Sequence, residues 1–185
     1  KYLRGPRGMG FLYVRQNRIA ELVPPFLDLH AATWVETNRY EIRPDARRFE
    51  NWETNYTGKL GLGTAIDYAL KLGVDRIWKR VQDLADDLRN RLEGLPGVTV
   101  HDKGAVRCGI VTFMAAGKKA EDIKAYMHNR HINVTTTSRF GTRLDMEDRG
   151  LDILVRASVH YYNTREEIDR FCAELTRFLE APGRE

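Results

Sequence analysis

The chain has 185 residues, of which 42% are hydrophobic and 30% charged, a balance typical of a globular protein with one sizeable core. Its longest apolar runs fall well short of the about 20 residues that a membrane-spanning helix needs, so the sequence predicts no membrane segment and no membrane partner. The net charge of +4 is modest and no RNP, KH or helix-turn-helix pattern accompanies it, which argues against nucleic acid and favours an anionic small molecule.

The chain opens on a basic, glycine-rich stretch. The apolar run at residues 10–14, bounded by glycines before it and polar residues after it, predicts a short buried strand. Residues 24–57 show no clean period, and so long an irregular segment is typical of a functional or binding loop. Because the first residue is Lys1 rather than methionine and no signal peptide is visible, we expect a fragment of a longer protein.

From Gly58 the pattern becomes helical. Apolar residues from Val74 to Leu92 recur at spacings of three and four, which predicts one amphipathic helix that ends at residues 95–97.

Short strands and helices then alternate. We predict strands at 98–101, 109–114, 132–136 and 153–161, a helix at 120–130, and a last helix that begins with a Thr164–Glu167 capping box. This order indicates an α+β unit whose mixed or antiparallel sheet is covered by helices on one side.

The two cysteines lie far apart in apolar contexts. Cys108 begins a predicted strand and Cys172 falls on the core face of the last helix, so both are expected to be buried structural thiols. No CxxC or metal-ligand cluster is present, which predicts no metal and favours a reducing, cytoplasmic compartment.

Residues 1–13, KYLRGPRGMGFLY, are the most informative stretch. They resemble the segment of the class V aminotransferase family (isopenicillin N epimerase, cysteine desulfurase and kynureninase-like enzymes) in which a lysine five residues before a proline precedes G-x-G and a strand. The resemblance implies that Lys1 forms the Schiff base with pyridoxal 5'-phosphate and moves the proton at the substrate Cα. The alternative is an exposed terminal lysine beside a glycine turn.

Residues 155–167 resemble the final strand and turn of the same family, with R-x-S followed by Y-N-T-x-E-E. The resemblance implies that Arg156 holds the α-carboxylate of an amino-acid substrate, a task that suits the planar guanidinium fork. The alternative is a strand arginine that pairs with a surface acid.

Residues 48–58 resemble a third family segment, R-F-E-x-G-T, whose threonine reaches the partner subunit's cofactor phosphate. Here Trp52 and Glu53 replace the glycine and threonine, and a glutamate would repel a phosphate. Thr54, Asn55 or Thr57 could take over the contact, and we predict Thr54 and Asn55 as cofactor-binding residues.

The loop between the last two strands carries the reactive cysteine in cysteine desulfurases. The corresponding residues 138–149 contain no cysteine. We therefore predict that this protein is not a cysteine desulfurase.

The resemblance as a whole implies the C-terminal half of a fold type I α/β enzyme that acts as a homodimer. Residues 1–57 would end the large cofactor-binding domain, 58–95 would be connecting helices, and 96–185 a small α+β domain. The remaining cofactor contacts of the family precede the lysine, so we expect the fragment alone to be inactive without the missing N-terminal half. The implied activity is aminotransferase-like, and the alternatives are a C–S lyase or epimerase of the same family, or a non-catalytic fragment that serves as an interaction domain.

Overall fold

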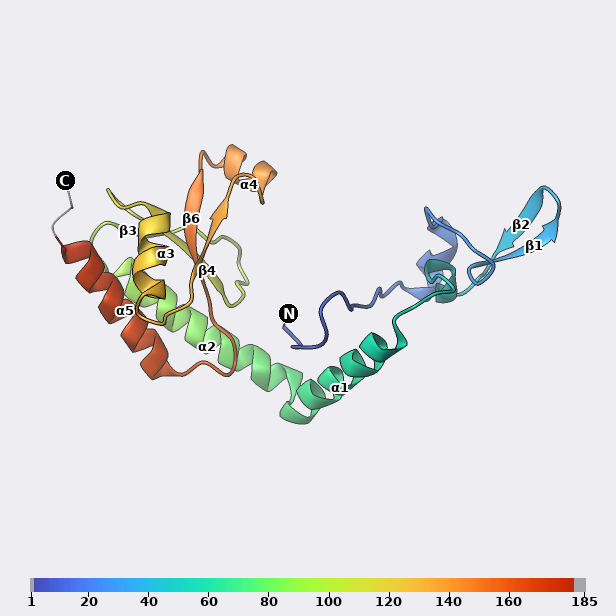
Figure 1. Ribbon diagram of the computed structural model, residues 1–185, viewed down its shortest axis with the longest axis horizontal. Coiled ribbons are helices and arrows are strands. Elements are labelled where there is room, and N and C mark those ends of the chain that lie inside the picture. The colour runs from blue at the N-terminus through green and yellow to red at the C-terminus, as the bar shows by residue number, and fades with distance from the viewer. Residues whose placement is uncertain (1, 182–185) are drawn as a thin grey trace. The chain divides into compact units, whose positions relative to one another are not determined.

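The computed structural model describes residues 2–181, and the contacts between Cα atoms divide the chain into two units, Lys1–Lys71 and Leu72–Glu185. Figure 1 shows the helices and strands of both units and labels most of them. No helix within the described residues is long and apolar enough to cross a membrane. The same residues contain no group of three or more side chains that could hold a metal ion.

The first unit has little regular structure. It contains two 3-10 helices, a two-stranded hairpin and one long helix: η1 (Gln16–Glu21), β1 (Ala32–Glu36), β2 (Arg39–Ile42), η2 (Ala46–Phe49) and α1 (Tyr56–Leu72). The hairpin was not predicted: its strands carry β-branched and aromatic residues, but its Thr37–Asn38 turn lacks the glycine that marks most two-residue hairpin turns.

The predicted buried strand at residues 10–14 is wrong. These residues belong to no strand, and Phe11, Leu12 and Tyr13 are between 69% and 77% exposed. A buried strand needs hydrogen-bonding neighbours and cover on both faces. The described part of the first unit has no sheet besides β1–β2, so the run has nothing to pair with.

The second unit is built on a four-stranded antiparallel sheet. Its strands are β3 (Val98–Val100), β4 (Ile110–Ala115), β5 (Thr135–Ser138) and β6 (Ile153–Ser158), in the spatial order β3-β4-β6-β5. Its helices are α2 (Val74–Glu93), α3 (Ala120–His128), α4 (Arg143–Asp148) and α5 (Arg165–Glu180). The predicted sheet covered by helices on one side is confirmed, with α2, α3 and α5 on one face (Figure 1), and of the two predicted alternatives, mixed or antiparallel, it is the antiparallel one.

All four strands differ from their predicted bounds, β3 and β4 by one residue at an end and β5 and β6 by two or three. The chain enters β5 only at Thr135, because Ile132 N still bonds to Met127 O and His131 has a positive φ of 58°, so residues 131–132 close α3. β6 ends before residue 161 because His160 N bonds to the Asn163 side chain and begins a turn.

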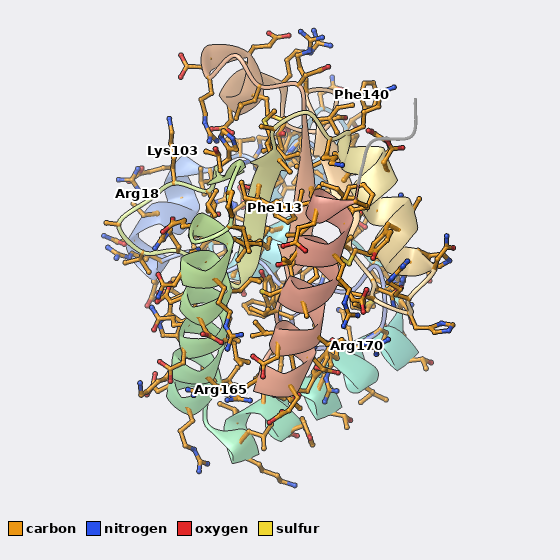
Figure 2. The ribbon with its side chains drawn as sticks, turned by 90° about the vertical axis from the view of Figure 1, so that its left-hand side faces the viewer. Arg18, Lys103, Phe113, Phe140, Arg165 and Arg170 are labelled. Atoms are coloured by element: carbon orange, nitrogen blue, oxygen red, sulfur yellow. The ribbon has the colours of Figure 1, made fainter. Side chains whose placement is uncertain are left out.

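Alternate residues of the central strands form the core with the helices. Val111, Phe113 and Val155 have no exposed surface, and the rings of Phe113 and Phe171 meet edge to face with centroids 6.2 Å apart. Figure 2 shows Phe113 between α2 and α5.

The predicted apolar face of α2 is confirmed: its residues are buried from Val81 to Leu92, whereas Val74 and Trp78 near the start of the helix remain exposed. The predicted capping box is present: Thr164 Oγ1 accepts from Glu167 N, and Glu167 Oε2 accepts from Thr164 N.

Candidate functional site

Lys1 lies outside the described residues, but the segment that follows it packs on α1. A Cβ atom added to Gly61 would lie 2.6 Å from Pro6 Cγ, and one added to Gly58 would lie 2.5 Å from Met9 Sδ. Real Cβ atoms do not approach other atoms so closely, so a larger residue at position 61 would push against the Pro6 ring, and one at position 58 would force the Met9 side chain to move. The two glycines thus let the glycine-rich segment after Lys1 lie directly against the helix.

We predict that Gly61→Ala loosens this segment. Alanine favours the helix by about 1 kcal/mol over glycine, but its methyl group would displace Pro6. Trypsin should therefore cut after Arg7 several-fold faster than in the parent, as followed by mass spectrometry. Gly63→Ala is the matched control, because a Cβ at residue 63 meets nothing within 4 Å, and equal cleavage of the two variants would contradict the prediction.

Thr54 and Asn55 lie at the N-terminus of α1. Asn55 Oδ1 accepts from Gly58 N at 2.8 Å and so caps the helix, while its amide nitrogen points away from this bond. Hydroxyl and amide donors at the positive end of a helix suit a phosphate group. The residues that the sequence assigned to the cofactor phosphate therefore form a chemically suitable donor set, although Glu53 adds a negative charge beside them.

Asp28 holds the turn that contains Trp52 and Glu53, a role that the sequence did not reveal. Its carboxylate accepts from Trp52 N at 2.7 Å, from His30 N at 2.9 Å and from Ala31 N at 3.1 Å. These bonds, above all the one from Trp52, hold the pKa of Asp28 below its usual value. Since aspartate commonly bonds to backbone N–H groups two or three residues on, the local turn could have been predicted, but the contact with Trp52 could not.

Arg156 lies in β6 on the sheet face opposite the helices. It is paired with Thr112 of β4 and Thr135 of β5, whereas its neighbours Val155 and Ala157 face the core. Its Nε atom is buried without a hydrogen-bond partner, and among residues 2–181 the side chain forms no ion pair. The described chain therefore does not contain the surface acid that the alternative interpretation of Arg156 requires.

The loop that should carry a desulfurase cysteine joins β5 to β6 and contains α4. It has no thiol. Arg149 fixes its end, because the guanidinium pairs with Asp145 at 2.8 Å and also donates to His101 O. Burial, together with the charge of Arg149, lowers the pKa of His101.

The two cysteines differ in exposure. Cys172 packs against the core, and burial raises its pKa to about 11. The expectation that Cys108 is buried is wrong: it is exposed, because β4 begins only at Ile110 and Cys108 belongs to the preceding loop.

We predict that iodoacetamide at pH 8 alkylates Cys108 much faster than Cys172. The thiolate is the reactive form, and the raised pKa of Cys172 leaves about one thiol in a thousand ionised at that pH. Peptide mapping over time should show Cys108 modified first, with similar rates only in urea. Faster labelling of Cys172 in the folded chain would contradict the described packing of α5.

Residues 1–171 match the family described as Aminotransferase class-V. The cysteine desulfurase of Salmonella agona (strain SL483) is 34% identical over 179 residues, which cover 95% of this chain and 43% of that protein. The apo cysteine desulfurase of Thermococcus onnurineus NA1 superposes with a TM-score of 0.84 at 26% identity, over 96% of this chain and 44% of that one.

The cystine C–S lyase C-DES shares the fold, with a TM-score of 0.75 at 22% identity over 95% of this chain and 44% of that one. A mutant of C-DES holds glycine covalently linked to its PLP cofactor. The chain thus spans less than half the length of the relatives that it matches. With the family match running through nearly all of the sequence, the chain belongs to the aminotransferase class-V family.

Proposed function

We propose that this chain is the C-terminal part of a pyridoxal-phosphate enzyme that acts on an amino acid. The observation that carries the proposal is Arg156, a strand arginine on the open face of the sheet with no acidic partner in the described chain. An unpaired guanidinium suits the α-carboxylate of an amino acid, which it can hold through two parallel hydrogen bonds.

The other roles follow from the family. Lys1 would be the covalent attachment point of the cofactor and would move the proton at the substrate Cα, and Thr54 and Asn55 would hold the cofactor phosphate. When bound, the cofactor supplies an electron sink for the carbanion at Cα. We assign an aminotransferase-like reaction, with epimerisation as an alternative of the same chemistry.

A C–S lyase is the second candidate function. It is favoured by the relatives, whose names describe the cleavage of carbon–sulfur bonds in cysteine or cystine. A desulfurase that passes sulfur to its own thiol is disfavoured, because the β5–β6 loop contains no cysteine. Lyase chemistry needs no such thiol.

We further propose that the complete protein is a cytoplasmic homodimer in which more polypeptide covers the first unit. Several large apolar side chains of this unit are well over half exposed, and exposed apolar surface of this kind is typical of a surface that another polypeptide covers; they include Phe11, Tyr13, Phe26, Trp34 and Leu60. The relatives also have more than twice the length of this chain. Residues 1–57 would then belong to the large domain, 58–95 to the connecting helices and 96–185 to the small domain.

Reduction with borohydride tests the proposal. The full-length protein, incubated with pyridoxal phosphate and reduced, should carry the phosphopyridoxyl group on Lys1 in a peptide map. The chain alone should bind the cofactor weakly and be inactive. Labelling of another lysine, or no labelling of the full-length protein, would overturn the assignment of Lys1.

A further inference from the structure

The buried Nε of Arg156 lacks an acceptor. This N–H group is shielded from solvent and has no hydrogen-bond partner in the described chain. A buried donor without an acceptor is unfavourable, and nearly all such groups in folded proteins have a partner. A substrate bound at the two terminal nitrogens would leave Nε without an acceptor, so the side chains that share its face of the sheet are the first candidates to supply one.

Two threonines are the nearest cross-strand neighbours of Arg156. Thr112 of β4 and Thr135 of β5 are both paired directly with it, so all three side chains leave the sheet on the same face. Directly opposed residues have Cβ atoms about 4.5–5.5 Å apart.

Both hydroxyl groups are available. Thr112 forms no side-chain hydrogen bond among the described residues. The bond of Thr135 Oγ1 to Thr136 O is 3.5 Å long, beyond the usual range for a hydroxyl donor. Rotation about a single side-chain bond, χ1, redirects either hydroxyl oxygen.

We propose that Thr112 and Thr135 are positioning residues for Arg156. The hydroxyl oxygen of one or the other accepts the Nε–H bond and so directs the outer edge of the guanidinium, with the two terminal nitrogens, toward a carboxylate. The inference rests on the proposed function, since it gives Arg156 a carboxylate ligand. The preference of Arg156 for a carboxylate then depends on two neutral hydroxyl groups from the adjacent strands.

The three consecutive threonines of β5 supply a matched control. Thr135→Val and Thr112→Val remove the proposed acceptors with almost no change of shape. Thr136→Val makes the same substitution one residue along, where the side chain is paired with Val155 and leaves the sheet on the opposite face. Thr112→Ser and Thr135→Ser keep the hydroxyl groups.

The first measurement is hydrogen exchange of the Arg156 Nε–H in ¹⁵N NMR spectra of the chain, with Arg156→Lys to assign the resonance. We expect protection in the parent and in Thr136→Val, and loss of most of it in the double variant Thr112→Val/Thr135→Val. The double serine variant should restore the protection. An equally protected Nε–H in the double valine variant would overturn the proposal, as would the loss of protection in Thr136→Val.

The second measurement is binding of an amino acid and of the corresponding amino-acid amide to the full-length, cofactor-loaded protein. The double valine variant should bind the amino acid about tenfold more weakly, in line with the loss of a hydrogen bond to a charged group, while the amide, which lacks the carboxylate, should bind as before. Equal weakening of both compounds would overturn the positioning role. If Arg156→Ala leaves amino-acid binding unchanged, the proposed function itself fails, whereas the exchange measurement still tests the contact with the threonines.

Discussion

Replacing Arg156 by alanine should weaken the binding of the amino-acid substrate by at least an order of magnitude. Loss of one member of a charge-assisted pair in a partly desolvated site costs about 2–5 kcal/mol, and about 1.4 kcal/mol corresponds to a factor of ten. The buried Nε of Arg156 indicates such partial desolvation. The dissociation constant can be measured from the change in visible absorbance of the bound cofactor when the full-length protein is titrated with amino acid.

Two further variants separate charge from geometry. Arg156→Lys should recover only part of the affinity, because an ammonium keeps the charge but cannot reproduce the planar fork. Arg177→Ala is the control, since Arg177 is an exposed arginine of α5 that pairs with Glu174, and it should bind like the parent. Cofactor content should be unchanged in all three. If Arg156→Ala binds the amino acid as tightly as the parent, the carboxylate anchor lies elsewhere.

Replacing Arg89 by methionine should destabilise the second unit by about 3–5 kcal/mol, the usual cost of removing one partner of a buried ion pair. Arg89 is 1% exposed, and its Nε lies 2.6 Å from Asp102 Oδ2. Its Nη2 donates to Cys108 O at 2.7 Å. Methionine preserves much of the volume but leaves a carboxylate and a carbonyl without their donor, so the loss reflects the polar contacts.

Unfolding in urea can be followed by the fluorescence of Trp78 in α2. The sequence contains three tryptophans, so Trp34 and Trp52 are replaced by phenylalanine to make the signal report on the second unit. Arg91→Met is the matched control two residues along α2. Arg91 is 38% exposed and pairs with Asp87 and Asp169, so its loss should cost less than about 1 kcal/mol. Added salt should reduce the effect at residue 91 more than at residue 89. A similar destabilisation by both variants would show that the buried contacts of Arg89 contribute little.

The amino-acid sequence by itself determined the family, the α+β class of the second unit and its main helices. Local signals were sufficient for these: the apolar period of α2 and the Thr164–Glu167 cap of α5 arise from residues within one or two turns of each other. The placement of Arg156 in the last strand followed from a motif of the same short range.

The tertiary structure decided what depends on distant partners. An apolar run becomes a strand only where another strand accepts its hydrogen bonds, so residues 10–14 could not be judged from their composition. The burial of Arg89 depends on Asp102 and on the carbonyl of Cys108, which both lie in the loop between β3 and β4 and reach α2 only after folding. The row of Thr112, Arg156 and Thr135 exists because strand register aligns three residues that lie 21 or more positions apart in the chain.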